Sequence, residues 1–263
     1  MSEQTSENRQ LPTIELSTPE LAYLLMLMQA PRLFGGDNQA LYPADRAAQE
    51  ALWAEGKRQL EASGRIVWDE DEKAYHIDRP MEFLVIEFAY PLAVLQCEIA
   101  RPTERLTYSY AIGANAIVQF ALRDQRYFLR YVPSAELMIA ELSELLALPE
   151  SRPNNLSFEL STQRLQGAQS DPSLLSDFPS SFSASLRQLR MSALISLFQV
   201  RESQLTGMRN ITLFQQDERI TWQAVVRDPS NPDLLDVQAS DRAQFAASLG
   251  EQLALILERQ VAE

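Results

Sequence analysis

Residue types that commonly perform chemistry are scarce in this chain of 263 residues. It contains one histidine, His76, and one cysteine, Cys97. Its eight glycines never form the spacing of a dinucleotide or phosphate loop. His76 lies in a strand-like segment without an evident relay partner, and Cys97 lies in an apolar one. We expect a surface or structural histidine and a buried thiol, and the sequence predicts no catalytic residue, metal site or cofactor.

Carboxylates offer the remaining route to catalysis. Residues 69–72 read Asp-Glu-Asp-Glu at the tip of a predicted hairpin, residues 65–77. We interpret this run as a solvated turn rather than a metal loop. An enzyme, either a hydrolase or one that acts on a small ligand, ranks third among the hypotheses for function, after the two non-enzymatic ones given below. It requires an enclosed pocket where carboxylates converge.

Composition narrows the classes of protein to consider. The formal net charge is -13 and 46% of the residues are hydrophobic, which favours a folded chain and opposes phosphate binding. The polar residues 1–12 predict a disordered tail without the apolar core of a signal peptide. The most apolar run, residues 83–97, is too short to span a membrane. With a single cysteine, these features predict a cytoplasmic protein with no membrane insertion and leave its oligomeric state open.

The first 80 residues permit a nucleic-acid alternative. Residues 21–28 and 46–63 are predicted helices, and the hairpin at 65–77 follows them, in the order of a winged helix. A winged-helix transcriptional regulator would need a basic stripe on the second helix. Three side chains would form it: Arg46, Lys57 and Arg58. The same helix carries three acids: Glu50, Glu55 and Glu61. This balance weakens attraction to DNA, and the other interpretation is a helical hairpin that caps a sheet.

The rest of the chain predicts an α+β fold. Period-two alternation and short links predict antiparallel strands at residues 92–100, 106–112, 118–122, 127–131, 194–200, 210–215 and 220–226. Apolar stripes predict helices at residues 137–148, 182–190 and 245–257. Ser134 should introduce the first of these helices, and Ser240 the last.

A short internal sequence repeat precedes two similar series of these elements. Residues 14–18, Ile-Glu-Leu-Ser-Thr, return as residues 158–162, Phe-Glu-Leu-Ser-Thr. A helix, several strands and an amphipathic helix follow each copy. We therefore expect two pseudo-repeated halves, residues 13–149 and 150–263, each an antiparallel sheet with flanking helices, together forming one pseudo-twofold domain.

A predicted hairpin connection in the second half is the candidate binding surface. Leu205 and Met208 flank Gly207, and exposed hydrophobic residues there would mark a contact patch, unless they fold back onto the sheet. Arginine greatly outnumbers lysine in the chain, and arginine makes multidentate contacts at interfaces, although biased genome composition also explains the ratio. The predicted partner-binding residues are Arg201, Leu205, Met208, Arg209, Ile211 and Arg219.

The order of several short motifs resembles that of the EspG family, the cytosolic chaperones of type VII (ESX) secretion. These motifs lie at residues 16–21 (LSTPEL), 60–67 (LEASGRIV), 124–133 (DQRYFLRYVP), 156–165 and 233–257. The resemblance implies a pseudo-twofold fold whose second half grips the helical tip of a secreted PE–PPE substrate. It implies a non-enzymatic chaperone or adaptor for a helical, PE–PPE-like or analogous protein partner, and the net charge predicts that no nucleic acid is bound.

Overall fold

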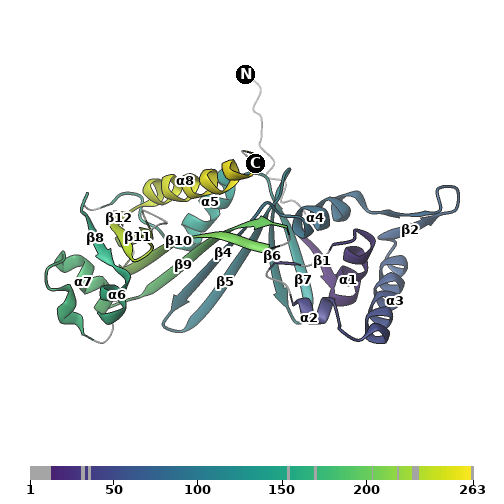
Figure 1. The fold of residues 1–263 in the computed structure, drawn as a ribbon, viewed down its shortest axis with the longest axis horizontal. Helices are drawn as coiled ribbons and strands as arrows, with labels where there is room; N and C mark the ends of the chain where they lie inside the picture. Colours follow the sequence, from purple (N-terminus) through teal and green to yellow (C-terminus); the bar gives the residue numbers. More distant parts are fainter. Residues whose placement is uncertain are drawn as a thin grey trace, which may run out of the picture. The chain divides into compact units, whose positions relative to one another are not determined.

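The computed structural model describes residues 13–261 except 31–32, 35–36, 153–154, 169–170, 203, 218 and 227–230. The predicted tail, residues 1–12, lies outside this part of the chain. The fold is α+β, with a large antiparallel sheet and flanking helices (Figure 1). None of the described helices is both long and apolar enough to cross a membrane.

The chain divides into two compact units. Unit 1 comprises Met1–Pro91 and Ala111–Val132, and unit 2 comprises Leu92–Tyr110 and Pro133–Glu263. The predicted boundary between residues 149 and 150 thus falls inside unit 2, and the predicted first half is shared between the units. The pseudo-repeat remains a prediction.

Unit 1 holds the elements β1 (Thr13–Ser17), α1 (Thr18–Leu27), α2 (Asn38–Leu41), α3 (Arg46–Ala62), β2 (Ile66–Asp69), β3 (Ala74–Ile77), α4 (Arg79–Ala89), β6 (Ile117–Arg123) and β7 (Arg126–Val132). Strands β1, β7 and β6 pair antiparallel in that order, and β2 and β3 form a separate hairpin. The predicted hairpin at residues 65–77 is confirmed.

Side-chain caps fix where the helices of unit 1 begin. Ser17 accepts a hydrogen bond from the backbone N–H of Glu20, whose carboxylate accepts one from the N–H of Ser17, a reciprocal capping box. Asp45 caps α3 and Asp78 caps α4. Leucines of α1 then pack into one core with residues of α3, α4, β6 and β7. The sequence patterns did not predict α4, because its apolar run continues into the next strand.

Unit 2 holds β4 (Ala93–Arg101), most of β5 (Glu104–Ile112), α5 (Ala135–Leu145), β8 (Ser157–Ser161), α6 (Thr162–Gly167), the 3₁₀ turn η1 (Pro172–Leu175), α7 (Ser180–Arg187), β9 (Met191–Arg201), β10 (Gln204–Asp217), β11 (Ile220–Val226), β12 (Leu234–Ser240) and α8 (Arg242–Val261). Its strand order is β5-β4-β9-β10-β11-β12-β8. The strands expected in this part of the sequence are present.

Helices cover both faces of the unit 2 sheet. Gln223 of β11 donates a hydrogen bond to Ser248 of α8 (2.6 Å), so this residue faces α8. Its neighbour Trp222 points to the opposite face, because successive strand residues alternate, and packs there against Phe182 of α7 (ring centroids 5.4 Å apart). Figure 1 shows α5 and α8 on one face and α6 and α7 on the other.

The caps of two predicted helices have different outcomes. Ser134 caps α5 as expected, accepting a hydrogen bond from the N–H of Leu137 (3.2 Å). Ser240 does not cap α8; it is the last residue of β12, and its hydroxyl donates to Gln223 (3.1 Å). The adjacent Asp241 accepts the hydrogen bond from the N–H of Gln244 (2.8 Å) instead. The serine prediction is wrong by one residue: Ser240 still belongs to β12, and Asp241, a comparably good cap, is the residue directly before α8.

Candidate functional site

The β9–β10 hairpin carries the exposed hydrophobic residues of the candidate site. Its register shifts between Thr206 and Arg209, where a β-bulge interrupts the pairing of the two strands. Gly207 has φ of 58° there, a left-handed conformation that favours glycine. Around this bulge the Leu205 side chain is 44% exposed and that of Met208 is 60% exposed. These two residues do not fold back onto the sheet.

Arginines flank this apolar pair. Arg201 is half-buried at the end of β9 and lies opposite Gln204 of β10. Arg209 is half-buried as well, and its guanidinium donates a hydrogen bond to Gln252 of α8 (3.1 Å). The structure therefore brings four of the predicted residues to one end of the β9–β10 ribbon, and α8 fixes the position of one of them.

Two predicted residues lie elsewhere. Ile211 is 2% exposed and packs in the interior, because its side chain points to the same sheet face as its cross-strand partner Ile195. Arg219 is in the turn between β10 and β11, at the other end of β10. A strand of 14 residues spans roughly 40 Å, so Arg219 is far from the hairpin connection. The surface defined by Leu205, Met208, Arg201 and Arg209 is called the hairpin surface below.

A cavity of about 340 Å³ adjoins the hairpin surface. Met208 and Arg209 contribute to its lining from β10, and Gln252 contributes from α8. Apolar side chains supply the rest of the wall, with Leu165 of α6, Val226 of β11 and Leu235 of β12 among them. Concave, mainly apolar sites with a few polar groups are typical of binding sites.

Asn210 gives this cavity an unsatisfied polar group. Among the side chains that the structure describes, Asn210 Oδ1 and Trp222 Nε1 are the buried polar atoms without a hydrogen-bond partner. Asn210 also lines the cavity. A buried amide oxygen without a donor is unfavourable, so an N–H or O–H group brought by a ligand would be stabilised there once the Asn210 side chain turns toward the cavity. No sequence signal singles out Asn210, because asparagine in an alternating strand is ordinarily a surface residue.

Apolar and neutral polar side chains make up most of the described lining of this cavity. Its described lining contains no aspartate, glutamate, histidine or cysteine. Cys97 is fully buried in β4, and burial, reinforced by the charge of Glu98, raises the pKa of its thiol to about 12. The prediction of a buried cysteine is confirmed, and a raised pKa predicts a poorly reactive thiol.

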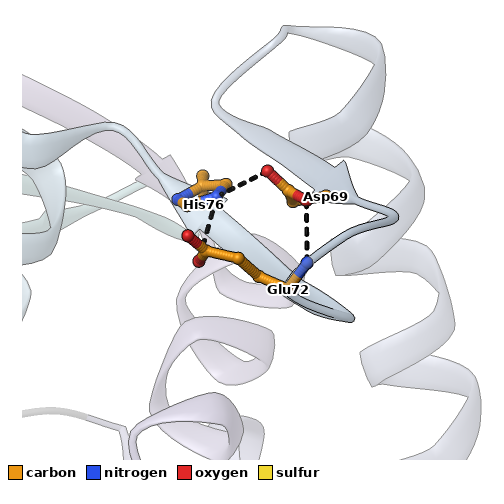
Figure 2. Close-up of side chains that lie close together, drawn as sticks. All are labelled: Asp69, Glu72 and His76. Carbon is orange, nitrogen blue, oxygen red and sulfur yellow. Dashed lines mark hydrogen bonds and ion pairs between the residues drawn. The ribbon is translucent and has the colours of Figure 1, made fainter.

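His76 has acidic partners that the sequence did not suggest. Its Nε2 lies 3.1 Å from Asp69 Oδ2 and 3.4 Å from Glu72 Oε2 (Figure 2). The expectation that His76 lacks such a partner is wrong, because the β2–β3 register places Asp69 and His76 diagonally on one face of the hairpin. The candidate ligand atoms of the three side chains lie within 4.8 Å of one another, a set that could hold a metal ion.

Hydrogen bonds from the backbone give this cluster a structural role in the turn. Asp69 Oδ1 accepts from the N–H groups of Asp71 (2.7 Å) and Glu72 (2.9 Å). These bonds, that of Glu72 first, lower the pKa of the Asp69 carboxyl, with a smaller contribution from His76. The cluster closes the tip of an exposed hairpin in unit 1.

The basic side chains required by a winged helix are occupied. Arg46 pairs with Glu50 (2.9 Å), Arg58 with Glu55 (2.6 Å) and Lys57 with Glu61 (3.8 Å) on α3. Each ion pair neutralises a charge that phosphate binding would need. The arrangement of α3 therefore disfavours DNA recognition.

Comparison with known proteins adds information on the fold. No protein-family model and no curated protein matches the sequence. The structure is similar to that of the Mycobacterium tuberculosis type VII secretion system chaperone EspG5, solved in complex with a PE25–PPE41 dimer. The TM-score is 0.63 at 11% sequence identity, over 92% of this chain and 96% of EspG5. This chain therefore has an EspG-like fold.

Proposed function

We propose that this chain is a non-enzymatic, cytoplasmic secretion chaperone or adaptor that binds the apolar helical tip of a secreted protein partner. The observation that carries the proposal is the exposed pair Leu205 and Met208 beside a cavity in unit 2. The similar chaperone EspG5 was solved with a protein bound, a PE25–PPE41 dimer. A PE–PPE-like or analogous helical protein is the corresponding partner here.

The hairpin surface has the anatomy of a protein-binding site. Full burial of a leucine or methionine side chain stabilises a complex by about 1.5–3 kcal/mol. Leu205 and Met208 are 44% and 60% exposed, so covering them contributes roughly 0.7–1.3 and 0.9–1.8 kcal/mol, respectively. Arg201 and Arg209 provide hydrogen-bond donors at the edge, the usual polar rim around apolar anchors.

The cavity suits a partner that presents the end of a helix better than a partner that presents a broad, flat surface. A helix tip presents a few apolar side chains together with backbone N–H groups that have no intrahelical partner. The apolar wall of the cavity would receive the side chains, and Asn210 Oδ1 would accept from an N–H group. The apolar wall and the amide lie within one site, and the amide needs only a rotation of its side chain to face the cavity.

Charge supports a protein partner over nucleic acid. The net charge of -13 keeps an unbound chaperone dispersed and repels phosphate. The occupied basic residues of α3 act in the same direction, against the winged-helix alternative. An enzyme is disfavoured because the cavity lining described above has no acid–base group.

Affinity capture of the tagged chain from its own cytosol, with nuclease treatment, tests the proposal. We expect a helical secreted protein to co-purify, and Leu205→Asp or Met208→Asp to abolish its capture by placing a charge in an apolar contact. Leu122→Asp is the matched control, since Leu122 is 42% exposed on β6 of unit 1. Equal capture by all three variants would contradict the site. Nucleic acid without a protein partner would contradict the function.

A further inference from the structure

A second apolar groove lies in unit 2, formed by α5 and α8. The two helices pack against each other on one face of the sheet (Figure 1). Their groove has a volume of about 670 Å³. Ile139 and Ala140 line it from α5, and Gly250, Leu253 and Leu257 line it from α8. None of these residues belongs to the hairpin surface.

Gly250 distinguishes this groove from an incidental gap between helices. Glycine destabilises the interior of a helix, yet Gly250 lies near the middle of α8. A Cβ atom built on Gly250 meets no atom within 4 Å, whereas one on Gly56 of α3 would lie 2.0 Å from the carbonyl oxygen of Pro19. Packing within the chain therefore explains the glycine at 56 and not the one at 250. The missing side chain leaves room for another backbone to approach α8 closely.

The charges around the groove favour one kind of occupant. Glu136 and Glu144 of α5 line it and are exposed, and Glu251 is exposed on α8. The basic lining residue Arg242 is engaged by Glu150 (3.1 Å). A second copy of the chain docked by the same surface would bring these acids together, because a twofold interface pairs a patch with itself. A basic partner would instead gain attraction from them.

We propose that the α5–α8 groove binds an amphipathic α-helix of a protein partner, with a narrow apolar stripe against Gly250 and lysine or arginine beside Glu136 and Glu144. A helix laid in this groove completes a three-helix layer over the sheet. Small residues on both walls permit the close approach, and the apolar stripe covers Leu257 and the exposed alanines Ala140 and Ala254. This site is independent of the hairpin surface.

A synthetic amphipathic helix tests the groove directly. The probe has an alanine–leucine stripe flanked by lysines and carries a fluorophore; its control has the same stripe flanked by glutamates. Fluorescence anisotropy should show binding of the lysine helix alone, weakened by salt. Gly250→Leu, which fills the groove, should lower the affinity at least about tenfold. Ala247→Leu, on an exposed part of α8 outside the groove, should leave it unchanged.

Further variants separate this site from the hairpin surface and from self-association. Glu144→Lys should weaken binding of the lysine helix, and Met208→Asp should not. Undiminished binding by Gly250→Leu, with circular dichroism showing the variant folded, overturns the proposal. Loss of binding in Met208→Asp alone would place the helix at the hairpin surface and likewise overturn it. So would a wild-type dimer, seen by sedimentation, that Gly250→Leu dissociates, since the occupant would then be a second copy.

Discussion

Replacing Gly56 by alanine should destabilise unit 1 although it improves the helix propensity of α3. The new Cβ would lie 2.0 Å from the carbonyl oxygen and 2.5 Å from the carbonyl carbon of Pro19, and 3.0 Å from Tyr23 Cβ. Two of these neighbours are backbone atoms at the start of α1, so no side-chain rotation relieves the overlap. Helices α1 and α3 would have to separate by about 1 Å, which forfeits close packing along their contact.

The magnitude follows from two opposing contributions. Glycine to alanine in a helix interior stabilises by about 1 kcal/mol. Overpacking a well-filled contact costs about 1–3 kcal/mol, and the upper end applies here because backbone must move. We expect Gly56→Ala to lower the free energy of unfolding by roughly 2 kcal/mol. In Gly250→Ala the overlap is absent, so the same substitution should raise it by about 1 kcal/mol.

Urea unfolding of both variants, followed by circular dichroism, measures these changes. Hydrogen exchange of peptides from α1 and α3, and from α8, assigns each change to its unit, since the two units need not unfold together. A Gly56→Ala protein as stable as the wild type, with unchanged exchange in α1, would refute the close approach. A destabilised Gly250→Ala protein would refute the open space above α8.

Three other outcomes are expected. Phe182→Ala should destabilise unit 2 by about 3–5 kcal/mol in urea unfolding, because this fully buried ring contacts Trp222 and the other aromatic residues of its cluster. Cys97 should resist a thiol reagent at pH 8 and react after denaturation, since burial raises its pKa to about 12. Asp69 has a pKa below its ordinary value of 3.8, because its ionised carboxylate accepts hydrogen bonds, that from the N–H of Glu72 first. This bond therefore stabilises the β2–β3 turn fully at any pH well above 3.8. That stabilisation should be lost as pH falls through the lower folded pKa, which the NMR shift of the Glu72 amide reports; a shift already complete above pH 3.8 would contradict it.

Local sequence patterns predicted much of the fold. The alternation in residues 126–132 and the apolar stripe after Ser134 specify a strand and a helix through nearest neighbours alone, and both are present. The missed helix α4 shows where this method fails. Its apolar residues run into β4 without a polar break, so periodicity alone does not separate the two, and the capping Asp78 is the local signal that does.

The candidate site was predicted in part for the same reason. Leu205 and Met208 flank a glycine in a turn, a local pattern, and both are exposed. The cavity beside them requires α6, β10, β11, β12 and α8, which are distant in sequence. The unsatisfied oxygen of Asn210 and the bond from Arg209 to Gln252 therefore could not be anticipated.

The sequence by itself determined the α+β class, most of the elements and the buried state of Cys97, because these depend largely on the pattern of neighbours along the chain, whereas it left open whether Leu205 and Met208 are exposed. Tertiary structure decided which residues meet. It separated Arg219 from Arg209 along a rigid strand and joined His76 to Asp69 through the register of a hairpin. It also placed Gly56 against the backbone of Pro19 and left open space beside Gly250. What surrounds a Cβ position depends on chain segments far away in sequence.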